Sequence, residues 1–239
     1  MRTAVMLMPL GVVLLNLYAL LLVLLRAPLY RTPLYRPMVL NIGLSVAPAV
    51  VMLLVVLGEL AIVRLVPDPS SAWVLGVLIV VGGLVWLLLL PNAGYLVTEL
   101  NFSHRRSDDP VPLWYDIVLV LSLALSGVLN TLVNVLLAQL AFAVLTGPDA
   151  DHPFARADAW AVATTVLALV AVGIYLGRYV RFNSWDLLHP ASFVRKLGAH
   201  FQGRDRLRAA GGFVLVHTVF FGILYLVVVA PVVVALARA

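Results

Sequence analysis

Residues 117–147 read IVLVLSLALSGVLNTLVNVLLAQLAFAVLTG, an unbroken stretch without a charged side chain. A helix needs about 20 apolar residues to cross the roughly 30 Å hydrocarbon core of a bilayer. The stretch exceeds that length, so it predicts a spanning helix that is tilted or extends beyond the bilayer. It therefore indicates an integral membrane protein.

The composition of the whole chain agrees. Of 239 residues, 63% are hydrophobic and 11% charged, with a mean hydropathy of +1.07, whereas soluble domains carry about 25% charged residues. These values exclude a water-soluble enzyme, a disordered tail and a nucleic-acid-binding module. The absence of cysteine from the sequence excludes disulfides, thiolate catalysis, cysteine-ligated zinc and iron–sulfur clusters.

Five further apolar stretches are long enough to span a membrane. With the first they predict an all-α, polytopic bundle of about six helices in a single domain over residues 1–239. The first stretch is too long for a signal-peptide core and has no cleavage site after it, so we expect it to be retained. The expected spans are residues 3–25, 37–63, 72–90, 113–146, 159–181 and 209–236.

Lysine and arginine are unevenly divided between alternate loops. Twelve fall on one side of the predicted spans and four on the other. Cytoplasmic loops carry the excess of these residues. We therefore expect a multi-pass protein of the inner (plasma) membrane with both termini outside the cytoplasm.

Residues 183–208 are the largest segment between two spans. Phe193, Leu197, then His200 or Phe201, and Leu207 recur there at helical spacing, with cations between them. The pattern predicts a basic amphipathic helix on the inner leaflet, where each cation near anionic headgroups contributes about 1 kcal/mol; a solvated loop is the alternative. The expected partners are membrane lipids, including anionic headgroups, and not nucleic acid. The oligomeric state does not follow from the sequence.

The third span ends in Pro91-Asn92-Ala93-Gly94-Tyr95. Proline lacks an amide donor and biases its predecessor away from helix, and glycine permits positive φ. The next residues are again apolar. We therefore predict a helix broken here that dips back into the interface, with Glu99 and His104 at its end.

Polar residues also flank the fourth and fifth spans at the same end. Trp114 fits the headgroup level, and Asp116 complements a helix N-terminus. Arg178 and Arg181 are three residues apart on one face, so they act either as snorkelling anchors or as guanidinium forks. The forks would hold Glu99, Asp116 or Asp186, or bind an anionic headgroup or phosphate. The candidates at this end are Asn92, Tyr95, Glu99, His104, Trp114, Asp116, Arg178, Arg181, Asn183, Trp185 and Asp186.

A polar stripe runs down the fourth span. Ser122, Ser126, Asn130 and Asn134 recur every four residues and therefore lie on one face of the helix. Such a stripe is more often a contact between helices than a conduit. Gly127, next to Ser126, also permits close approach of another backbone.

Three motifs occur in a specific order: residues 91–95, the segment Pro112-Leu113-Trp114-Tyr115-Asp116, and residues 175–186, YLGRYVRFNSWD. Over about residues 40–190 the chain resembles the bacterial integral-membrane family catalogued as domain of unknown function 1361. Family members often have proline at the position of Gly94 and tryptophan at that of Phe182. The resemblance implies a membrane fold and matches Asn92, Asp116, Arg178, Arg181 and Asp186, but the family has no established activity to carry over.

Three functions remain open. Transport, or the handling of lipids or anions, is favoured by the polar stripe, the broken span and the arginine pair. The alternative of a membrane-embedded enzyme for a phosphate-bearing or lipid-linked substrate would use the acids and His104 as general acid or base. A non-catalytic scaffold is the third. No zinc motif, nucleophile elbow or phosphate loop is present, so we predict no metal or cofactor.

Overall fold

The computed structural model describes residues 2–65, 71–100, 110–147, 156–180 and 190–237, and these form helices without any strand. Six helices are long and apolar enough to cross a membrane, which confirms an all-α bundle with six spans. The elements are α1 (Arg2–Tyr30), α2 (Arg36–Leu65), α3 (Ser71–Tyr95), the 3₁₀ helix η1 (Leu96–Leu100), α4 (Leu113–Thr146), α5 (Ala157–Tyr175), the π-helix η3 (Leu176–Val180), α6 (Pro190–His200), α7 (Arg204–Val228) and α8 (Ala230–Ala237).

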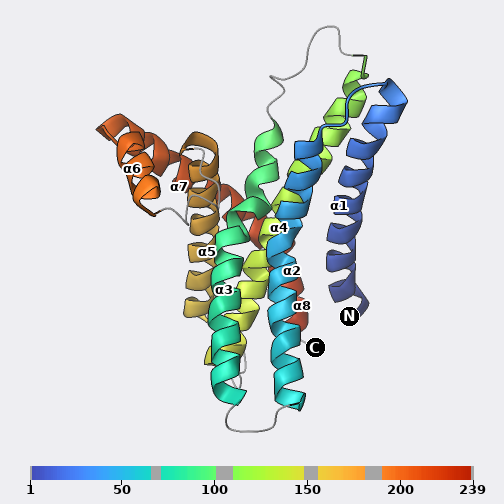
Figure 1. The fold of residues 1–239 in the computed structure, drawn as a ribbon. Helices are drawn as coiled ribbons and strands as arrows, with labels where there is room; N and C mark the ends of the chain where they lie inside the picture. The colour runs from blue at the N-terminus through green and yellow to red at the C-terminus, as the bar shows by residue number, and fades with distance from the viewer. Residues whose placement is uncertain (1, 66–70, 101–109, 148–155, 181–189, 238–239) are drawn as a thin grey trace.

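Helix α4 passes through the middle of the bundle (Figure 1). Its first half, with Tyr115 and Leu123, packs against α1, α2 and η1. Its second half, with Leu132 and Val135, packs against α3, α5 and α7. Buried residues of α4 thus belong to both halves of the core, and α4 holds these halves together.

Glycines bring α3, α4 and α5 into close contact. A Cβ added to Gly127 of α4 would lie 3.2 Å from the carbonyl oxygen of Ala93. One added to Gly173 of α5 would lie 2.2 Å from Cγ of Pro91. Small residues at helix interfaces allow such close backbone approach in membranes. The prediction of a close approach at Gly127 is therefore confirmed.

The predicted break at Pro91 is wrong. Helix α3 continues through Pro91 to Tyr95 and then tightens into η1. Proline is tolerated in spanning helices where neighbouring helices compensate for the lost hydrogen bond, and here its ring packs directly over Gly173. The predicted return of the chain into the interface involves residues 101–109, which lie outside the described residues.

The predicted amphipathic helix is α6, but it is shorter than expected. It ends at His200, and Gly203 makes a corner at φ 115° before α7 begins. A φ in this range suits glycine. Leu207 and the cations after it therefore belong to α7. The expected single helix over residues 209–236 is also two helices, because α7 stops at Val228 and α8 begins just before Pro231.

The two ends of the bundle differ in charge. Helix α1 begins and α8 ends near the same end (Figure 1). At the opposite end, where α3 and α5 finish and α4 and α7 begin, the described carboxylates are Asp116 and Asp205. The described cations of this end, hereafter the basic end, are Arg26, Arg31, Arg36, Arg178, Arg195, Lys196, Arg204, Arg206 and Arg208.

Candidate functional site

The basic end contains a junction of two helices that are not α-helical. Arg178 lies on η3, and its Nη1 donates a hydrogen bond to the carbonyl oxygen of Thr98 on η1 at 3.3 Å. Both 3₁₀ and π turns depart from the regular hydrogen-bond pattern, and π turns are frequent at functional sites. We call this contact the η1–η3 junction.

Arg178 has donor capacity left at this junction. Its guanidinium carries five N–H donors, and the side chain is only half-buried. Among the described residues no carboxylate lies within ion-pair distance of it.

Aromatic rings line the junction on the side of α5. Tyr175 and Tyr179 stack with their ring centroids 4.8 Å apart. The hydroxyl of Tyr175 is 3.0 Å from Nε2 of His200, so α6 is fastened to the end of α5. Tyr175 also stacks on Phe201 at 6.2 Å. The end of α5 and η3 thus carries a cluster of aromatic rings.

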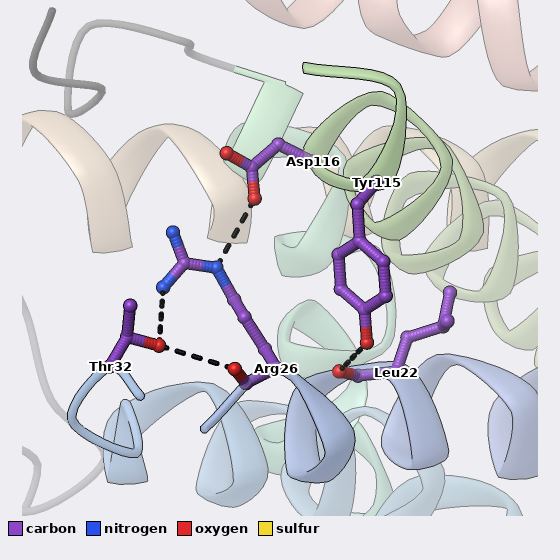
Figure 2. A network of polar contacts seen from close by, with 5 residues as sticks. All are labelled: Leu22, Arg26, Thr32, Tyr115 and Asp116. Atoms are coloured by element: carbon purple, nitrogen blue, oxygen red, sulfur yellow. Dashed lines mark hydrogen bonds and ion pairs between the residues drawn. The ribbon is translucent and has the colours of Figure 1, made fainter. Parts of the chain in front are cut away.

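Asp116 pairs with Arg26, a residue that the sequence interpretation had not proposed as its partner. Nε of Arg26 lies 3.1 Å from Oδ1 of Asp116. Figure 2 shows the guanidinium between this carboxylate and the hydroxyl of Thr32, which accepts from Nη1 at 3.2 Å. Helix α1, rather than η3, brings this arginine to the first turn of α4.

Tyr115, the residue before Asp116 on α4, also contacts α1. The hydroxyl of Tyr115 donates to the carbonyl oxygen of Leu22 at 2.8 Å (Figure 2). Trp114 is 63% exposed and meets the ring of Tyr115 edge-on at 5.6 Å. Tyr115 and Asp116 therefore fix α1, whereas the exposed indole faces outward, as expected for a side chain at the headgroup level.

The polar stripe of α4 is buried, and its two asparagines bind other helices. Asn130 exchanges hydrogen bonds of 2.9 and 3.0 Å with Asn16 of α1. It also donates to the hydroxyl of Ser45 on α2 at 2.9 Å. Ser45 donates in turn to the carbonyl oxygen of Ala93 on α3 at 2.8 Å. One chain of hydrogen bonds thus joins four helices, hereafter the asparagine network.

Asn134 extends this network. Its Oδ1 accepts from the indole of Trp86 on α3 at 2.9 Å, and its amide donates to the carbonyl oxygen of Asn130. Ser122 and Ser126 instead donate to carbonyl oxygens of α4 itself. The stripe is therefore bound within the protein, as expected of contacts between helices.

Comparison with known proteins identifies the chain. The model of a family described as "Protein of unknown function (DUF1361)" matches residues 41–228. The chain belongs to this family. No curated protein and no solved structure matches the chain.

The family match confirms the resemblance and covers the η1–η3 junction, α6 and most of the asparagine network. Helix α1 precedes the matched residues. Its Asn16 nevertheless completes a buried polar contact of α4, and its Arg26 a part-buried one. Part of the polar core is thus supplied from outside the matched region.

Of the remaining candidate residues, the structure describes two side chains. Asn92 and Tyr95 are half-buried on the last turns of α3. The ring of Tyr95 lies 3.6 Å from the position that a Cβ on Gly177 would take, beside the start of η3. The side chain of Glu99 is not described, and His104, Arg181, Asn183, Trp185 and Asp186 lie outside the described residues.

Sequence reasoning missed Asn16, Arg26, Ser45 and Thr98. Asn16 is a single polar residue in an apolar span, and a buried amide in a membrane needs a partner, so its position was a usable indication. Thr98 acts through its backbone carbonyl, which no side-chain pattern reveals.

Proposed function

We propose that this protein binds and handles a phosphate-bearing anion at the η1–η3 junction, in transport or in lipid handling, with Arg178 contacting the anion. The ligand chemistry is a phosphate group, borne by a lipid headgroup or by a soluble molecule. Guanidinium forks bind phosphate with two parallel hydrogen bonds, and Arg178 has donors for both.

The observation that carries the proposal is the meeting of two irregular helices at one arginine. Irregular backbone at membrane depth is tolerated where it is buried in protein or lines a polar site. Interrupted helices near polar groups are common where solutes bind. The bond from Arg178 to the carbonyl oxygen of Thr98 is the only described one that joins η1 and η3.

The charge distribution supports the same end of the molecule. By sequence, the loops and helix ends at the basic end contain twelve lysines and arginines against six carboxylates. An end of this charge attracts anions. By the positive-inside rule it also lies in the cytoplasm, with both termini outside, in the inner membrane of a bacterium.

A second candidate, a non-catalytic scaffold or assembly protein, is favoured by the asparagine network. Asn130 and Asn134 bind neighbouring helices and therefore lend no support to a polar conduit along α4. Of the groups that the enzyme alternative could use as acid or base, Asp116 is the one whose side chain is described. That carboxylate is engaged by Arg26, and its other candidate partners lie outside the described residues.

The proposal is tested by mass spectrometry of small molecules and lipids that co-purify with the intact protein. A charged hydrogen bond contributes roughly 1.5–3 kcal/mol, so Arg178→Gln should reduce bound phosphate-bearing species about tenfold or more. Arg36→Gln is the matched control, because Arg36 is an exposed cation of the same end at the start of α2.

The two sources of phosphate are separated by the identity of the retained species. Phospholipid retained by the unaltered chain and lost with Arg178→Gln indicates a lipid ligand, and a soluble phosphate compound with the same behaviour indicates the other source. Equal retention of every anionic species by both variants would contradict the proposal and favour the scaffold.

A further inference from the structure

Hydrogen bonds of an exposed arginine join α6 and α7 at the corner between them. Nη1 of Arg206 donates to the carbonyl oxygens of Ala199 and His200, at 3.3 and 3.1 Å, and so binds the last turn of α6 to the first turn of α7. His200 binds the hydroxyl of Tyr175. Helix α6 therefore has one face fixed on α5 and a defined orientation relative to α7.

The exposed side chains of this corner include both cations and apolar residues. Arg195 of α6 and Arg204 of α7 are exposed. Val194 is 66% exposed and Leu207 55%. Figure 1 shows α6 projecting from the side of the bundle, beside the upper ends of α5 and α7. No described part of the chain covers this surface, which we call the α6–α7 corner.

We propose that the α6–α7 corner is a docking surface for the anionic lipids of the leaflet in which the basic end lies. Helix α7 is one of the six spans and begins at Arg204, so its first turn lies where the headgroups are. A surface of cations with apolar side chains between them inserts shallowly at the boundary of headgroups and acyl chains. Charge complementarity selects anionic headgroups over zwitterionic ones.

This surface is separate from the η1–η3 junction and does not depend on the function proposed for Arg178. The junction offers a half-buried guanidinium to a single anion. The α6–α7 corner offers exposed cations from two helices, which suits a layer of many headgroups rather than one bound molecule. Its effect would be to hold α6 flat on the membrane.

The chain contains no cysteine, so a single label can be placed on the corner. Val194→Cys carrying a nitroxide is reconstituted as the full chain into nanodiscs of phosphatidylcholine, alone or mixed equally with phosphatidylglycerol. Collision with oxygen and with a water-soluble nickel chelate measures the depth of the label. We expect the label at headgroup depth with phosphatidylglycerol and nearer to water without it, and added salt should reduce the difference.

Two variants with equal loss of charge complete the test. Arg195→Gln with Arg204→Gln removes one cation from each helix of the corner. Each cation contributes about a fivefold preference for anionic over zwitterionic lipid. The change in label depth that phosphatidylglycerol causes, which we call the response, should therefore fall roughly tenfold or more. Arg31→Gln with Arg36→Gln removes two cations elsewhere at the basic end and should leave the response unchanged. The same label depth in both lipids, or the same response in both double variants, would overturn the proposal.

Discussion

At the scale of single residues, Asn130 is the side chain on which most of the interior depends. Replacing it by leucine leaves Asn16 and Ser45 without their partner on α4. Hydrogen bonds between spanning helices average about 0.6 kcal/mol and reach about 1.7, and an unpaired buried amide adds a further cost. We expect Asn130→Leu to lower the free energy of unfolding by roughly 1–4 kcal/mol, measured by unfolding in mixed micelles.

Ser126→Ala is the control for this effect. Ser126 lies on the same buried stripe, but its hydroxyl donates only to the carbonyl oxygen of Leu123 in its own helix. Its removal should therefore cost much less. Equal losses in the two variants would mean that polarity along the stripe, rather than the contacts between helices, stabilises the bundle.

Gly173 makes a second prediction at this scale. A Cβ there would lie 2.2 and 2.4 Å from Cγ and Cβ of Pro91, and 3.5 Å from its Cα. Proline cannot rotate away, so α3 or α5 must shift. Overpacking of this kind costs about 1–3 kcal/mol, and Gly173→Ala should lower the thermal stability in detergent. Gly83→Ala, where nothing lies within 4 Å, should have little effect.

At the scale of elements, the spans were predictable because hydropathy alone decides where they lie. The residues at which the helices end depend instead on contacts with neighbouring helices and on local backbone conformation. Pro91 suggested a break by its own backbone chemistry, yet the neighbouring Gly173 accommodates the ring and α3 continues to Tyr95. The spacing of apolar residues in the segment 183–208 suggested one helix, but the conformation of Gly203 divides it. In both places tertiary structure overrides a correct local preference.

The corner between α6 and α7 makes a prediction for these two elements. Arg206 binds the terminal carbonyl oxygens of α6, so Arg206→Gln should loosen its last turn. We expect amide hydrogen exchange across α6 to accelerate severalfold, with α5 unaffected. Arg208→Gln is the control, because Arg208 is 80% exposed and only 4.0 Å from the fully exposed Asp205. Unchanged exchange in Arg206→Gln would show that the contact between Tyr175 and His200 holds α6 by itself.

At the scale of the whole molecule, the sequence located the polar residues of the basic end but not their pairing. Asp116 was recognised as needing a partner, and Arg178 and Arg181 of the fifth span were the candidates. The partner is Arg26, because α1 packs along α4 and presents its last turns to the start of that helix. Pairing across helices depends on which helices are neighbours, and a single sequence of uniformly apolar spans does not specify that.

Because the spans are uniformly apolar, the orientation of the chain in the membrane depends on the charges of its loops. This leads to a prediction for the whole chain. The spans have no apolar preference for either side of the membrane, so the excess of arginine and lysine at the basic end should hold that end in the cytoplasm. Because the chain has no cysteine, Gly198→Cys on α6 and Ala157→Cys at the start of α5 report the two sides separately; both positions are exposed. A membrane-impermeant thiol reagent applied to intact cells should label the cysteine at position 157 and leave that at 198 unreacted until the membrane is opened. The reverse result would place both termini in the cytoplasm and move the η1–η3 junction to the outer face, where a cytoplasmic phosphate compound could not reach Arg178.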